Sequence, residues 1–100
     1  MVAVKLSTQK IRAELHKLPN WKLKQGKLYR ELRFKNFNVA WGFMSQAALI
    51  MEQMNHHAEW KNVYNQVTLF LRTHSAKGVT VLDFQLAHKL EVVAKPLLKN

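Results

Sequence analysis

The first apolar pattern along the chain is helical. Ile11, Leu15 and Leu18 recur at i, i+4 and i+7, behind Ser7 or Thr8, either of which can cap a helix. Proline and asparagine follow directly and end the segment. We therefore expect an opening helix that turns one side toward a core.

Two later regions alternate apolar and polar residues, as strands do. Residues 21–24 and 28–34 flank the turn signal Gln25-Gly26 and predict a short hairpin. Residues 60–64 and 67–73 predict a second hairpin, with Asn65-Gln66 near its turn.

A longer helix is expected between the hairpins, from Asn36 or Asn38 to about Met54. Its apolar residues cover more than one stripe: Phe37, Val39, Ala40, Trp41, Phe43, Met44, Ala47, Ala48, Leu49, Ile50, Met51 and Met54. A helix that is apolar on two faces is usually buried on two sides. In so small a protein the second side predicts a subunit interface, since a monomer would leave a large apolar patch in water.

Thr80-x-x-Asp83 is a capping box and predicts a third helix over about 81–95, ended by Pro96. Its inner stripe is Leu82, Leu86, Leu90, Val93 and Leu97. The order α-β-β-α-β-β-α predicts an α+β fold in which three helices pack on one face of a four-stranded antiparallel sheet. With a length of 100 residues, we expect one domain over 1–100.

Composition narrows the chemistry. The chain has no cysteine, which removes disulfides, thiolate ligands and a thiol nucleophile and leaves His, Asp, Glu and Tyr. The N-terminus has no apolar signal region, and no apolar run approaches the length of a membrane span. We expect a soluble, cytoplasmic protein.

The net charge is +10, and such a charge attracts polyanions whatever the fold. The basic residues are scattered, however, with only a mild concentration over 17–35. No zinc-finger spacing, RNP-type aromatic motif or GxxG loop is present. Nucleic-acid binding is therefore an unfavoured third hypothesis.

Three of the five histidines are expected to converge. His56 and His57 follow the long helix, and His74 ends the last strand, which returns antiparallel toward them. Imidazole, with an ordinary pKa of about 6.5, can give or take a proton at neutral pH, so the cluster suits general acid–base catalysis. His16 and His88 lie on helices outside it.

Several interpretations of this cluster remain open. A zinc site is disfavoured, because adjacent histidines are not a usual ligand spacing, although three separated ligands remain an alternative. Asp83 either caps the third helix or orients a histidine. Glu52 lies one turn before His56 and could reach the pair. Trp21 and Trp60 are core residues or platforms for a flat heterocycle.

Three motifs carry a resemblance to a known family. They are Phe34-Lys35-Asn36-Phe37-Asn38-Val39-Ala40-Trp41-Gly42-Phe43-Met44, then Glu52-x-x-Asn55-His56-His57-x-Glu59-Trp60-x-Asn62-Val63-Tyr64-Asn65-x-Val67, and then Leu71-x-Thr73-His74 with Gly78-Val79-Thr80-x-x-Asp83. With these motifs the chain resembles the pterin-4a-carbinolamine dehydratases from about Leu18 to Val93.

The resemblance implies the same element order, with dimers and tetramers formed through the sheet edge and the second helix. It implies a lyase that dehydrates 4a-hydroxytetrahydrobiopterin to quinonoid dihydropterin, in support of aromatic amino-acid hydroxylases. The resemblance implies no metal. It implies no cofactor either, because the pterin is the substrate.

The resemblance also implies roles for single residues. His56 and His74 would be the acid–base residues, and His57 would mainly bind substrate. The implied substrate-binding residues are Asn55, His56, His57, Arg72, Thr73, His74 and Ser75, with Glu52, Trp21 and Asp83 as supporting positions. One departure is Ala58, where the family usually has proline; alanine would hold His57 less firmly in an extended conformation.

The alternative function is a non-catalytic dimerisation or transcriptional coactivator module, whose apolar second helix docks a partner helix. Animal members of the family act in this way with a homeodomain transcription factor, which would add a nuclear pool if the source were eukaryotic.

Overall fold

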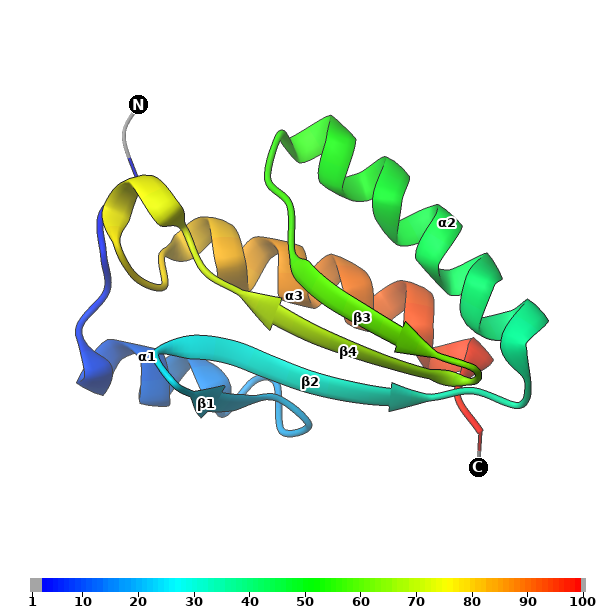
Figure 1. Ribbon diagram of the computed structural model, residues 1–100. Coiled ribbons are helices and arrows are strands. Elements are labelled where there is room, and N and C mark those ends of the chain that lie inside the picture. Colours follow the sequence, from blue (N-terminus) through cyan, green and yellow to red (C-terminus); the bar gives the residue numbers. More distant parts are fainter. Residues whose placement is uncertain (1–2, 100) are drawn as a thin grey trace.

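The computed structural model describes residues 3–99, and within them three helices and a four-stranded antiparallel sheet follow the expected order (Figure 1). The helices are α1 (Thr8–Leu15), α2 (Phe37–Met54) and α3 (Val81–Ala94), and the strands are β1 (Lys22–Lys24), β2 (Lys27–Arg33), β3 (Glu59–Val63) and β4 (Gln66–Leu71). Short 3-10 helices, η1 (His74–Ala76) and η2 (Lys95–Leu97), follow β4 and α3. The predicted α+β fold class is confirmed.

The sheet has the strand order β1-β2-β4-β3, and every neighbouring pair is antiparallel. Both predicted hairpins are present, but the second turn was placed one residue too late. Val63 pairs with Gln66, so the turn residues are Tyr64 and Asn65, and Tyr64 takes a left-handed conformation with φ 51°. Asn65 fixes this turn, because its side-chain amide donates to the Phe34 carbonyl at 2.8 Å.

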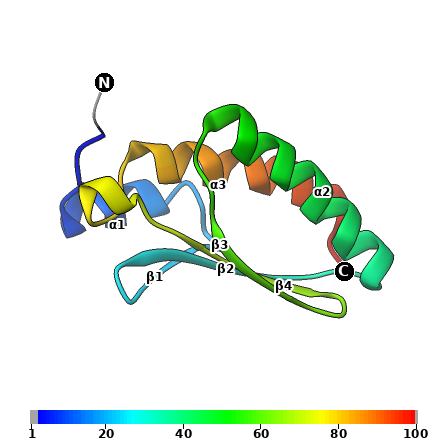
Figure 2. The ribbon, with the colours of Figure 1, turned by 45° about the horizontal axis from the view of Figure 1, so that its top comes forward.

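One face of the sheet supplies half of the core. Leu28 and Leu32 of β2 and Val67, Leu69 and Leu71 of β4 are almost completely buried. All three helices lie on this side of the sheet (Figure 2), and their core residues, including Phe43, Leu86 and Leu90, join the same cluster. Within residues 3–99, no helix covers the other face of the sheet.

Helix α2 has the two apolar sides that its sequence predicts. Ala40, Phe43, Ala47 and Met51 are buried against the core. On the outer side the side chains of Phe37, Trp41 and Leu49 are 42%, 55% and 68% exposed. In the part of the chain that the structure describes, the outer apolar side is therefore exposed. No helix within residues 3–99 is both long enough and apolar enough to cross a lipid bilayer.

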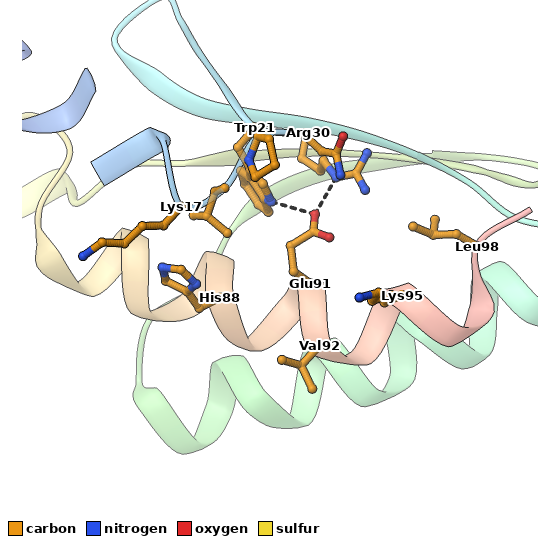
Figure 3. Close-up of a pocket in the computed structure, with 11 residues that line it drawn as sticks. Lys17, Trp21, Arg30, His88, Glu91, Val92, Lys95 and Leu98 are labelled. Atoms are coloured by element: carbon orange, nitrogen blue, oxygen red, sulfur yellow. Dashed lines mark hydrogen bonds and ion pairs between the residues drawn. The ribbon is translucent and has the colours of Figure 1, made fainter. Parts of the chain in front are cut away.

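An ion pair ties the sheet to α3. Arg30 lies on the inner face of β2, between two buried leucines, and its Nε donates to Glu91 Oε1 at 2.6 Å. Trp21, only 3% exposed, donates its indole Nε1–H to the same oxygen at 2.8 Å. Figure 3 shows both side chains pointing at Glu91 from the sheet, beside a cavity of about 350 Å³ that His88 and Lys95 also line.

Replacement of Glu91 tests this tie. Glu91→Ala leaves the Arg30 guanidinium and the Trp21 N–H without their acceptor, and should lower the free energy of unfolding by about 2 kcal/mol. Glu14→Ala is the matched control on α1, because the ion pairs of Glu14 among the described residues are with the exposed Lys10 and Lys17, each at 3.6 Å. It should cost less than about 0.5 kcal/mol. Equal losses in urea unfolding would contradict the assignment.

Candidate active site

The three predicted histidines line one cleft of about 390 Å³ at the end of the sheet where β4 ends and β3 begins. In Figure 1 the last turn of α2 and the loop after β4 both lie toward this end of the sheet. The cleft is lined by Asn55, His56, His57, Ala58, Glu59, Arg72, Thr73, His74 and Ser75. All seven residues of the predicted substrate-binding set therefore lie around one space.

The end of α2 places the first two histidines. Asn55 adopts a left-handed conformation with φ 52°, and its N–H donates to the Glu52 carbonyl. The His56 N–H donates to the Met51 carbonyl at 3.0 Å. These two bonds form a Schellman motif, which ends the helix sharply and turns the chain toward β3. Asn55 suits this position because asparagine tolerates the left-handed region better than most residues.

Asp83 performs both of the roles that its sequence position allowed. Its carboxylate is fully buried, and Oδ1 lies 2.6 Å from His56 Nε2. Oδ2 accepts the Thr80 N–H at 2.8 Å, which completes the capping box of α3, and the Thr73 hydroxyl at 2.9 Å. One carboxylate thus caps the helix and orients a histidine of the cleft.

The hydroxyls around Asp83 can donate in only one order. A carboxylate accepts only, so Thr73 must donate to Oδ2. Thr80 Oγ1, at 2.7 Å from Thr73 Oγ1, must then donate to it, and it accepts the Leu82 N–H at 3.2 Å. Thr73 is 5% exposed and supports Asp83. Thr80 belongs to the same network, although the sequence identified this residue only as the start of a capping box.

The pairing with Asp83 selects the tautomer of His56. Because Oδ1 is an acceptor, neutral His56 carries its hydrogen on Nε2 and its lone pair on Nδ1. Nδ1 has no hydrogen-bond partner among residues 3–99. Every buried side-chain nitrogen and oxygen in that range does have a partner, so Nδ1 is not buried and has some accessible surface. His56 is 10% exposed and lines the cleft, and Nδ1 is its ring nitrogen whose lone pair Asp83 does not engage.

The other two histidines are held more loosely. His57 Nε2 lies 3.1 Å from Glu52 Oε2, so the predicted contact of Glu52 is with His57, but these side chains are 56% and 79% exposed. His74 opens η1, in a loop closed by reciprocal backbone hydrogen bonds between Thr73 and Gly78. The cleft therefore combines one fixed imidazole with two exposed ones.

Other predicted residues lie elsewhere or differ in their contacts. Trp21 precedes β1, two strands away from β4 in the sheet order, and its indole is bonded to Glu91 and not to the cleft. His16 and His88 are exposed outside it. The Ala58 N–H points at Met51 Sδ at 3.5 Å, a weak contact that a proline could not make. Among residues 3–99, no group of three or more His, Asp or Glu side chains could hold a metal ion.

Comparison with known proteins agrees with the fold. The model of the family described as pterin 4 alpha carbinolamine dehydratase matches residues 4–93. A protein of Solibacter usitatus, assigned by name to pterin-4-alpha-carbinolamine dehydratase, is 50% identical over 93 residues, which cover 93% of this chain and 98% of that one. A similarly assigned protein of Sinorhizobium fredii is 45% identical, over 90% of this chain and 88% of its own.

A solved structure shares the fold as well. The crystal structure of a transcriptional coactivator/pterin dehydratase from Brucella melitensis superposes with a TM-score of 0.87 at 41% identity, and covers 90% of this chain and 98% of that one. The fold and the family match together identify a small α+β lyase. The chain belongs to the pterin-4a-carbinolamine dehydratase family.

The two carboxylate–histidine pairs provide a matched test of the site. In Asp83→Asn the amide offers one acceptor oxygen to three facing donors, so the free energy of unfolding should fall by about 2 kcal/mol. In Glu52→Gln an exposed pair is lost, and the change should stay within about 0.5 kcal/mol. Urea unfolding of both variants measures this, and an Asp83→Asn protein as stable as the parent would refute the network.

Proposed function

We propose that this chain dehydrates 4a-hydroxytetrahydrobiopterin to quinonoid dihydropterin and water by histidine acid–base catalysis. Family membership supports the reaction. The observation that carries the mechanism is the 2.6 Å pair between His56 Nε2 and the buried Asp83, in a cleft that His57 and His74 also line.

The reaction needs one proton donor and one proton acceptor. The C4a–O bond breaks as a proton reaches the leaving hydroxyl, and the N5 proton leaves as the C4a=N5 double bond forms. His56, with its hydrogen held on Nε2, would take the N5 proton at Nδ1. His74, exposed at the start of η1, would protonate the hydroxyl, and exchange with solvent would reset both rings.

The other cleft residues would hold the substrate. His57, held by Glu52 and largely exposed, is suited to bind the pterin. Asn55, Arg72 and Ser75 line the same space and carry hydrogen-bonding groups for a heterocycle rich in nitrogen and oxygen. Thr73 would act through Asp83. Trp21 would have a supporting role only through its tie to α3, since its indole is bonded to Glu91.

The outer side of α2 supports a homo-oligomer. Phe37, Trp41 and Leu49 would bury their exposed apolar surface against α2 of a second copy, and the sheet edge offers a further dimer contact. A dimer or tetramer in the cytoplasm, recycling the pterin of an aromatic amino-acid hydroxylase, would fit the proposed reaction.

The alternative is a non-catalytic module that docks a partner helix on the same side of α2. The exposure of Trp41 favours this as much as it favours a second copy. The Brucella melitensis structure is described as a coactivator as well as a dehydratase. Histidine substitutions in the cleft test the dehydratase function, and a substitution on α2 tests the docking function.

Histidine substitutions test the catalytic proposal. His56→Ala and His74→Ala should each lower kcat on the order of 100-fold or more, because each removes an acid–base group. His57→Ala should mainly raise KM. His88→Ala, an exposed histidine outside the cleft, is the control and should keep the parent rate. The assay is carbinolamine loss at neutral pH with chelator present, and unchanged rates in both kcat variants would overturn the proposal.

Charge on α2 tests the assembly. Trp41→Glu should reduce the oligomer to a smaller species in sedimentation, because a carboxylate would be buried at the contact. Lys89→Glu on α3 makes a larger charge change at an exposed position, and should leave the size unchanged. Should Trp41→Glu keep both size and dehydratase rate but lose binding of a partner helix, the alternative function would be favoured.

A further inference from the structure

The uncovered face of the sheet gathers basic and aromatic side chains that are distant in the sequence. Residues directly opposite each other in an antiparallel pair lie on the same face. The inner face holds Leu28, Leu32 and Leu69, so their sequence neighbours lie on the outer face. The strand registers thus define this surface residue by residue.

The outer face is arranged in rows across the strands. One row is Lys22, Tyr29, Phe70 and Glu59, and the next toward the tip of the second hairpin is Glu31, Thr68 and Lys61. Lys24 pairs with Lys27 on one side of these rows, and Arg33 pairs with Gln66 on the other. We call this set of residues the open sheet face.

An aromatic pair lies in the middle of the open sheet face. Tyr29 and Phe70 are cross-strand partners on the two central strands, with ring centroids 5.1 Å apart and planes tilted by 49°. Lys24 Nζ lies 4.5 Å from the Tyr29 centroid, and Lys27 Nζ lies 5.8 Å from that of Phe70. The Tyr29 hydroxyl donates to Glu31 at 2.8 Å, which raises the pKa of Tyr29 and keeps the ring neutral.

Cations outnumber anions on the open sheet face. It carries five cationic side chains and two anionic ones: Lys22, Lys24, Lys27, Arg33 and Lys61 against Glu31 and Glu59. The Lys27 ammonium is paired with Glu59 at 3.0 Å, and Arg33 reaches Glu31 only at 3.9 Å. Among residues 3–99 no salt bridge joins Lys22, Lys24 or Lys61 to an acid, so their charges are available to a polyanion.

We propose that the open sheet face binds single-stranded nucleic acid, with bases stacked on Tyr29 and Phe70 and phosphates against Lys22, Lys24, Arg33 and Lys61. Aromatic rings on the central strands of an exposed sheet, surrounded by cations, are the combination that stacks unpaired bases and attracts their backbone. A duplex keeps its bases covered, and an acidic peptide has no rings to stack, so both would use the cations alone.

The aromatic pair is tested with fluorescein-labelled oligo(dT) and anisotropy. Tyr29→Leu combined with Phe70→Leu keeps apolar bulk but removes the flat rings, and should weaken binding about tenfold or more. Tyr64→Leu removes an aromatic ring that is 63% exposed at the hairpin turn, and should bind as the parent does. Unchanged affinity of the double variant, or equal affinity of the parent for the duplexed oligonucleotide, would overturn the proposal.

A charge-matched pair of variants separates the open sheet face from the general attraction of a basic protein. Lys24→Ala with Lys61→Ala should weaken binding and reduce the slope of log affinity against log salt by about 1.4, for two phosphate contacts. Lys10→Ala with Lys89→Ala removes the same charge from exposed positions on α1 and α3, and should change neither value. Equal losses in both pairs, or full displacement of oligo(dT) by poly-glutamate of equal charge, would show charge attraction only.

This proposal is independent of the dehydratase reaction. The lysine variants alter exposed side chains, so they carry the test even if the aromatic double variant fails to fold. All four sheet-face substitutions lie outside the histidine cleft and should keep the dehydratase rate of the parent.

Discussion

The Asp83 carboxylate holds the cleft and the fold together, because its two oxygens meet different parts of the chain. Oδ2 satisfies the first turn of α3 and the Thr73 hydroxyl at the end of β4, while Oδ1 meets His56 beyond the end of α2. A fully buried carboxylate is costly unless every oxygen is paired, and here it is paired with donors from three segments. The orientation of His56 is therefore as well determined as the N-terminus of α3.

The rest of the cleft follows from how two elements end. The left-handed Asn55 stops α2 and sends the chain into β3, and the bridge between Thr73 and Gly78 closes the loop that carries His74. Since β3 and β4 are antiparallel neighbours, the start of one lies beside the end of the other. Rigid sheet pairing thus brings together histidines that are 18 positions apart in the sequence, from His56 to His74.

Local patterns predicted the elements well, because period and capping signals act over short distances. The capping box at Thr80 and both hairpins could be read directly from the residues, and the cap of α2 was narrowed to Asn36 or Asn38, of which Asn36 is the cap. The turn at Tyr64 was misplaced because a bulky residue with positive φ is an uncommon choice that pattern alone disfavours. The tie between Trp21 and Glu91 spans 70 positions, and the double use of Asp83 depends on tertiary packing. The basic residues looked scattered for the same reason, because only the strand register assembles the open sheet face.

The fixed direction of the hydroxyl chain has a consequence for proton traffic. Every group that faces Asp83 is a donor, from His56 on one oxygen to Thr73 and the Thr80 backbone on the other. A proton that passed from His56 to this carboxylate could move on only if Thr73 and Thr80 both rotated, and the Thr80 hydroxyl hydrogen would then need an acceptor other than Thr73. The buried network is a dead end for protons. Exchange with bulk water must therefore run through the exposed side of the imidazole ring. The carboxylate orients the ring but does not carry its protons to solvent.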